Sequence, residues 1–208
     1  MDTKEEPSMS NREKTVRLVT LGFLIALVVV LQVWGSGIKV GQTSFSLVLI
    51  PIAVGAMLLG PSAGALLGFV FGLITLIAGI TAVDPFTNIL FQEAPVITSL
   101  ICLGKGTAAG FGAGWAYRLV AKRNEFAAAF CAAAAAPLLN TGLFAFGSLF
   151  VRKILEQNFM PEGTSFFFFL FVGIIGVNFL VEFSVNMIVT PALHRIVKVA
   201  GKQLKVEM

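Results

Sequence analysis

The sequence predicts an all-α integral membrane protein in which six transmembrane helices form a bundle. Its composition is 57% hydrophobic and only 12% charged, which is far from the composition of a soluble domain. Residues 45–79 contain no charged side chain and are interrupted only by Gly60-Pro61. A single membrane span needs about 20 apolar residues, and glycine followed by proline ends one helix and begins the next. This stretch is therefore predicted to be two spans joined by a minimal turn.

Hydropathy divides the rest of the chain in the same way. The six predicted spans are residues 16–34, 43–59, 62–80, 95–117, 126–150 and 166–191. A polar tail over 1–15 precedes the membrane domain of 16–197, and a basic tail over 198–208 follows it. The links 35–42, 81–94 and 151–165 are predicted to be loops on the side opposite the termini.

The distribution of lysine and arginine predicts the orientation in the membrane. An even number of spans places both termini on one side. Eleven basic residues lie on that side: Lys4, Arg12, Lys14, Arg17, Arg118, Lys122, Arg123, Arg195, Lys198, Lys202 and Lys205. Only Lys39, Arg152 and Lys153 fall in the opposite loops. The positive-inside rule then predicts that both termini are cytoplasmic. The basic residues form no single face with interleaved aromatics, so nucleic-acid binding is not expected.

One cation is predicted to lie within the membrane. Lys105 is near the middle of the fourth span, about 15 Å from its outer end. An unpaired ammonium at such a depth costs roughly 2.5 to 3.5 kcal/mol on insertion scales, so it is expected to face the bundle interior and to have a partner. That partner is either a protein carboxylate or a ligand.

Polar residues of the last two spans lie at related depths. Asn178, Glu182 and Asn186 recur every four residues and so share one face of the sixth span. Asn140 in the fifth span and Asn178 lie at about the depth of Lys105 by the same helical rise. Two interpretations stay open. The residues form a polar cluster that orients a small ligand in an apolar pocket, or Lys105 reaches Glu182 in a structural network.

Small residues recur at four-residue steps on three spans. Gly22 and Ala26 form such a pair on the first span, and this spacing permits close helix approach within the chain or to a partner. Two glycine series on the third and fourth spans are predicted to pack helices inside the bundle: Gly64, Gly68 and Gly72, then Gly106, Gly110 and Gly114.

The sequence lacks the residue patterns that are typical of catalytic sites. There is no G-x-x-x-x-G-K-[ST] phosphate-binding loop, the one histidine, His194, is at a helix end, and Cys102 and Cys131 lie in apolar segments. We therefore expect no enzyme activity, no cofactor and no bound metal. A stand-alone ion-coupled secondary transporter of a small polar solute is the alternative function, with Lys105 and Glu182 as a proton-linked pair.

The chain also resembles a known family. The basic start TVRLVTLGFLIALVVVLQ, the helix pair IPIAVGAMLLGPSAGALLGFVFGLITLIAG and the six-span length are similar to the substrate-binding S component of an energy-coupling factor (ECF) vitamin transporter. The resemblance implies a prokaryotic plasma-membrane protein that captures a vitamin from outside. It implies two sets of protein partners, a transmembrane scaffold subunit and two cytoplasmic ATPases.

The resemblance also implies roles for particular residues. A small-residue motif on the first helix docks against the scaffold in this family, and Gly22 and Ala26 occupy that place, with glycine replacing the first alanine. The family binds its ligand near the outer side, among the last three helices, where Lys105, Asn140, Asn178 and Glu182 are the expected substrate-binding residues.

The positive charge of Lys105 narrows the choice of ligand. A buried cation favours a vitamin with a carboxylate or phosphate, so pantothenate is the leading candidate, while riboflavin, hydroxymethylpyrimidine, folate and cobalamin remain open. The polar segment 36–44 between the first two spans is predicted to be a lid that orders over bound ligand.

Overall fold

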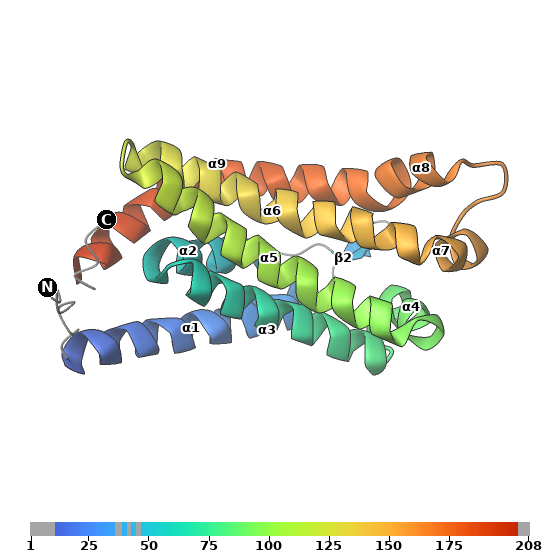
Figure 1. Ribbon diagram of the computed structural model, residues 1–208, viewed down its shortest axis with the longest axis horizontal. Coiled ribbons are helices and arrows are strands. Elements are labelled where there is room, and N and C mark those ends of the chain that lie inside the picture. The colour runs from blue at the N-terminus through green and yellow to red at the C-terminus, as the bar shows by residue number, and fades with distance from the viewer. Residues whose placement is uncertain (1–10, 36–38, 41–42, 45–46, 204–208) are drawn as a thin grey trace, which may run out of the picture.

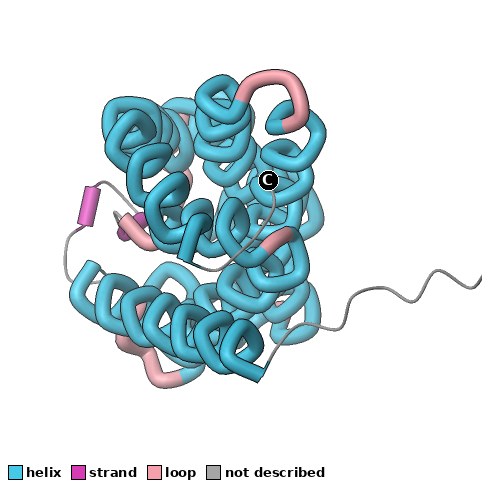
Figure 2. Tube along the Cα trace, turned by 90° about the vertical axis from the view of Figure 1, so that its left-hand side faces the viewer, coloured by secondary structure: helices cyan, strands magenta, loops and turns pink. Residues whose placement is uncertain are grey.

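The computed structural model describes residues 11–35, 39–40, 43–44 and 47–203 as a bundle of helices. Its elements in chain order are α1 (Asn11–Gly35), β1 (Lys39–Val40), β2 (Thr43–Ser44), α2 (Leu49–Leu59), α3 (Pro61–Ile80), α4 (Pro85–Glu93), α5 (Pro95–Ala121), α6 (Glu125–Phe150), α7 (Arg152–Asn158), α8 (Phe166–Phe168), the π-helix η1 (Phe169–Gly176) and α9 (Val177–Gln203). The long helices lie side by side, and α1 begins at the same end of the bundle at which α9 finishes (Figure 1). Figure 2 views the bundle from that end.

Five helical segments in the described chain are long and apolar enough to cross a membrane. They are α1, α3, α5, α6 and the continuous run from α8 through η1 to α9. Their outward faces carry large apolar side chains such as Leu18, Leu100, Phe146 and Ile188, each more than half exposed. Such surfaces are stable in lipid and not in water. The protein is a multi-pass membrane protein.

The predicted second span, residues 43–59, is wrong in its length. Thr43–Ser44 pair with Lys39–Val40 as a short antiparallel ladder, and helix α2 has only 11 residues, about 16 Å. All of its residues except Ile50 are buried, because α1, α3, α5, α6 and α9 surround it. Hydropathy does not separate a helix buried in protein from one buried in lipid. The six predicted full spans are therefore five long helices and one short core helix.

The turn between α2 and α3 is the one that the sequence predicted. Gly60, with φ of 98°, caps the end of α2 and the beginning of α3, and Pro61 is the first residue of α3. This positive φ is accessible to glycine at little cost. The guanidinium of Arg17 donates to the carbonyl oxygen of Leu59 at 3.0 Å, which satisfies one of the free carbonyls at the end of α2.

Helices α3 and α5 pack backbone to backbone through their glycines, as predicted. A Cβ atom added to Gly64 would collide with the carbonyl of Gly110, and one added to Gly68 would collide with the carbonyl of Gly106. Side chains larger than hydrogen would separate the two helices. This contact fixes the height of Lys105, which directly precedes Gly106, against α3.

The predicted loops 81–94 and 151–165 contain two short helices, α4 and α7, which the sequence analysis missed. Asn158 on α7 donates to a carboxylate oxygen of Glu93 at 3.1 Å, and the rings of Phe86 and Phe159 lie 4.8 Å apart. The hydroxyl of Thr98 on α5 donates to the carbonyl of Leu90 on α4 at 2.9 Å. These contacts make α4 and α7 a cap at the end of the bundle opposite the start of α1 (Figure 1).

Helix η1 joins this cap to α9 with π geometry. Two buried pairs, Phe169-Leu170 and Ile174-Ile175, are five residues apart and belong to one apolar cluster with α4 and α7. An α-helix would turn residues five apart about 140° away from each other, whereas the wider π turn keeps both pairs on one face. A Cβ atom on Gly176 would lie 2.6 Å from the carbonyl oxygen of Phe171. The π turn therefore depends on glycine at position 176.

Candidate functional site

A cavity of about 120 Å³ lies beneath the cap and is lined by side chains of α1, α3, α4, α5, α6, η1 and α9. All four predicted substrate-binding residues, Lys105, Asn140, Asn178 and Glu182, line it. The depths calculated from the helical rise predicted that these residues of three helices lie close together, and the structure places them around one cavity.

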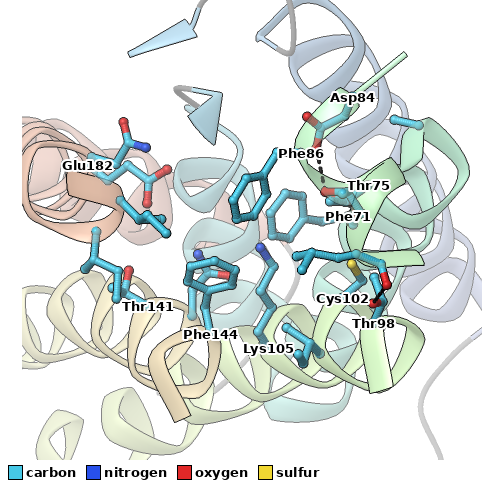
Figure 3. Close-up of a pocket in the computed structure, with 18 of the residues that line it drawn as sticks. Phe71, Thr75, Asp84, Phe86, Thr98, Cys102, Lys105, Thr141, Phe144 and Glu182 are labelled. Carbon is cyan, nitrogen blue, oxygen red and sulfur yellow. Dashed lines mark hydrogen bonds between the residues drawn. The ribbon is translucent and has the colours of Figure 1, made fainter. Parts of the chain in front are cut away.

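Lys105 reaches the cavity from the face of α5 that also carries Thr98 and Cys102. Its ammonium nitrogen lies 5.1 Å from the ring centre of Phe144 and 5.8 Å from that of Phe71. Figure 3 shows this amino group between the two rings. A cation over an aromatic face gains about 0.5 to 2 kcal/mol. The rings hold the ammonium in place without neutralising it.

The structural ion pair between Lys105 and Glu182, one of the two open interpretations, is not formed in the described part of the chain. Glu182 is buried, with 8% of its surface exposed, and Figure 3 shows it at a different side of the cavity from Lys105. Its backbone carbonyl accepts a hydrogen bond of 2.8 Å from Asn186.

Asn140 and Asn178 bring unused hydrogen-bonding capacity to the cavity. The side-chain oxygen of each is buried and has no partner among the residues that the structure describes, and Asn140 as a whole is 8% exposed. Buried amides in native proteins are almost always hydrogen-bonded to protein, water or ligand. Rotation of an amide by 180° exchanges its donor and acceptor ends, so each side chain is able to serve either type of ligand group.

Asn186, the third member of the predicted polar stripe on α9, does not line this cavity. It is 2% exposed, and its backbone carbonyl accepts a hydrogen bond of 2.6 Å from the hydroxyl of Thr190. The stripe therefore continues below the cavity into the core between helices.

Most of the remaining cavity wall was not predicted. The polar residues that sequence reasoning missed are Gln32, Thr75, Asp84, Thr87, Thr98 and Thr141, and the aromatic ones are Phe71, Phe86, Phe144 and Phe179. The spacing of Thr98, Cys102 and Lys105 on one helix face was a usable signal. The phenylalanines gave none, because the chain has 20 of them and many face outward.

Gly22 and Ala26 lie on the outer face of α1, away from the cavity. Both are exposed, and a Cβ atom on Gly22 would meet no atom within 4 Å. The small pair therefore does not serve packing within the described chain. It leaves a shallow, open surface on α1 between larger exposed side chains such as Phe23 and Val30.

Comparison with known families decides the identity of the bundle. A model of the substrate-specific component of ECF transporters matches residues 16–194. This chain belongs to that family. The resemblance read from its first three helices is confirmed, and the ECF substrate-specific component is a transport protein of the membrane whose family binds a small molecule and assembles with scaffold and ATPase modules. No match was found among curated proteins.

Proposed function

We propose that this ECF substrate-specific component captures a small vitamin that carries a carboxylate, with Lys105, Asn140, Asn178 and Glu182 as substrate-binding residues. The observation that carries the proposal is the ammonium of Lys105, held between Phe71 and Phe144 in a cavity. A cation within an apolar bundle is costly unless an anion joins it. An anionic ligand supplies that partner only when it binds, which couples neutralisation of Lys105 to occupancy.

Pantothenate is the vitamin that we favour. Riboflavin and hydroxymethylpyrimidine have no carboxylate for Lys105, and folate and cobalamin are much larger molecules than pantothenate. Pantothenate is small, and it combines a carboxylate with an amide and hydroxyl groups. The amides of Asn140 and Asn178, whose oxygens have no partner in the described part of the chain, are suited to such polar groups because an amide both donates and accepts.

The partners that we propose are a transmembrane scaffold subunit and two cytoplasmic ATPases, with Gly22 and Ala26 on the scaffold-facing surface of α1. The support is that both residues are exposed and that Gly22 has open space above it. Both termini are proposed to be cytoplasmic in the plasma membrane of a prokaryotic cell, since the basic residues gather at their end of the chain.

Ligand binding by the purified protein tests the proposal. Titration calorimetry in detergent with pantothenate, riboflavin, hydroxymethylpyrimidine, folate and cobalamin is expected to give tight binding of pantothenate alone, and the Lys105→Met variant is expected to lose it. Binding of a neutral vitamin with unchanged affinity in Lys105→Met would overturn the anionic class.

Uptake by whole cells distinguishes a component that needs ATPases from a stand-alone transporter. Uptake is expected to require co-expression of the scaffold and both ATPases. Uptake that continues without them and collapses with the proton gradient would instead establish the secondary transporter.

A further inference from the structure

The turn between α3 and α4 holds an acidic side chain over the cavity in an unusual way. Asp84 occupies the position before the first residue of α4, where an aspartate ordinarily accepts hydrogen bonds from the backbone N–H groups of the first turn. Its side chain makes no such bond. It accepts a hydrogen bond of 2.5 Å from the hydroxyl of Thr87 and lines the cavity beside Phe86.

The backbone of this turn adopts a conformation that its sequence does not favour. Ala82 has φ of 59°, the one positive φ of a residue other than glycine in the described chain. L-residues rarely adopt this conformation, and where they do the strain is commonly associated with function. The turn is fixed by two further bonds, from the backbone N–H of Asp84 to the carbonyl of Ala78 at 3.0 Å and from the side chain of Asn88 to the carbonyl of Gly79 at 2.7 Å.

Asp84 and Lys105 thus bring opposite charges to one cavity. They do not form an ion pair with each other among the described residues, and Figure 3 shows Asp84 beyond the ring of Phe86 as seen from Lys105. A carboxylate is only an acceptor, so it repels the anionic group that Lys105 attracts. It prefers a group that donates hydrogen bonds.

We propose that Asp84 is a specificity-determining residue, and that the substrate carries a hydrogen-bond donor, such as a hydroxyl or an N–H group, at the end opposite its anionic group. The anion binds at Lys105 and the donor at Asp84, so the cavity selects dipolar molecules and rejects simple carboxylic acids. This inference rests on the proposed function, because it takes the same cavity as the substrate site. The hydroxyl groups of pantothenate, which lie at the end away from its carboxylate, meet the requirement.

The test pairs two variants with two ligands. The ligands are pantothenate and the analogue that keeps its carboxylate and amide but lacks both hydroxyls. If the wild type binds a different carboxylate vitamin in a Lys105-dependent way, that vitamin and its analogue without hydrogen-bond donors replace these two ligands in the test. Asp84→Asn retains the size of the side chain and removes its charge. Asn88→Ala is the matched control, because it removes a bond of the same turn from a residue that does not line the cavity.

Calorimetry is expected to show that Asp84→Asn weakens binding of the hydroxylated ligand about 10- to 100-fold, the loss typical of a bond to a charged group. Binding of the donor-free analogue, already weak in the wild type, should be unaffected. Asn88→Ala should lower the melting temperature and leave the affinity unchanged.

Each other outcome overturns a distinct statement. If Asp84→Asn weakened binding of both ligands equally, or of neither, Asp84 would not recognise the donor. The proposed function would still stand in that case, as long as binding depends on Lys105. Failure of the wild type to bind any carboxylate vitamin would overturn both.

Discussion

Gly68 on α3 and Gly106 on α5 face each other so closely that the carbonyl oxygen of each occupies the place of a Cβ atom on the other. The two helices touch through their backbones at this level. Lys105 precedes one of these glycines, and Phe71, which packs on the Lys105 ammonium, is one helical turn from the other. The helix contact therefore sets the geometry of the cavity as well as the stability of the bundle.

Replacing Gly68 by alanine is expected to destabilise the protein and to weaken ligand binding. The added methyl group meets backbone atoms that have no room to move, and such overpacking typically costs about 1 to 3 kcal/mol. Separation of the helices also moves Phe71 away from Lys105. Melting temperature and ligand affinity of the detergent-purified variant measure the two effects.

Gly104→Ala is the matched control for this change. Gly104 lies on α5, the helix that Gly68 contacts, and a Cβ atom there meets no atom within 4 Å. Alanine at this position is therefore expected to be neutral or to stabilise the helix by about 0.5 to 1 kcal/mol. Equal melting temperatures for the two variants would contradict the close backbone contact.

Replacing Lys105 by methionine is expected to reduce ligand affinity steeply. Methionine retains the aliphatic bulk between Phe71 and Phe144 and removes the charge. Loss of one partner of a desolvated charge pair costs about 2 to 5 kcal/mol, which corresponds to roughly 30-fold to several thousand-fold in affinity. The melting temperature of the free protein should change little, because the lost cation–π contacts are offset by removal of a poorly solvated charge.

The double variant with Glu182→Gln tests the competing arrangement. If Lys105 neutralised Glu182 in the functional protein, Lys105→Met would lower the melting temperature and Glu182→Gln in the same chain would restore it. Such a rescue, with ligand affinity hardly altered, would refute the ligand-contact role of Lys105.

The features predicted correctly from the sequence depend on local backbone chemistry or on the free-energy cost of placing polar groups in an apolar bundle. Gly60-Pro61 marks a turn because only particular residues suit its backbone, and the glycines of α3 and α5 mark a close contact because nothing larger fits. Lys105, Asn140, Asn178 and Glu182 were expected to face the bundle interior because polar groups in an apolar helix are expensive, and they line one cavity; their role in substrate binding stays a prediction. Their depths followed from the helical rise alone.

The features that were missed depend on tertiary structure. The short length of α2 follows from its enclosure by other helices, which leaves no trace in hydropathy. Helices α4 and α7 are too short for a periodic signal. Asp84 reads as a helix start, and its direction toward the cavity depends on a turn conformation at Ala82 that no propensity favours.

Adding bulk to the small pair of α1 is expected to separate substrate binding from assembly. Gly22→Leu or Ala26→Leu should block close approach of a partner helix, while the cavity and its ligand affinity stay intact because neither residue lines it. Co-purification with the scaffold subunit and calorimetry with ligand measure the two properties separately.

Gly142→Leu on α6 serves as the control, since Gly142 is also exposed and has open space for a Cβ atom. It should assemble normally. Normal yield of the complex with both α1 variants would show that the scaffold docks elsewhere.

Replacing Gly176 by alanine is expected to disturb the cap over the cavity. The methyl group would press on the carbonyl of Phe171, 2.6 Å away, and so disfavour the π turn that keeps Phe169 and Leu170 in the cap cluster with α4 and α7. We expect a lower melting temperature, by the overpacking cost of about 1 to 3 kcal/mol, together with weaker ligand binding.

Opening of the cap is directly measurable through Cys102, which lines the cavity and is 4% exposed. With the exposed Cys131 replaced by serine, a water-soluble thiol reagent should label Cys102 faster in Gly176→Ala than in the parent. Gly173→Ala is the matched control within η1, because its Cβ atom would meet no backbone atom, only the side chain of Phe169 at 3.1 Å. If the π turn does not hold the cap in place, Gly176→Ala and Gly173→Ala should show the same rate of Cys102 labelling and the same ligand affinity.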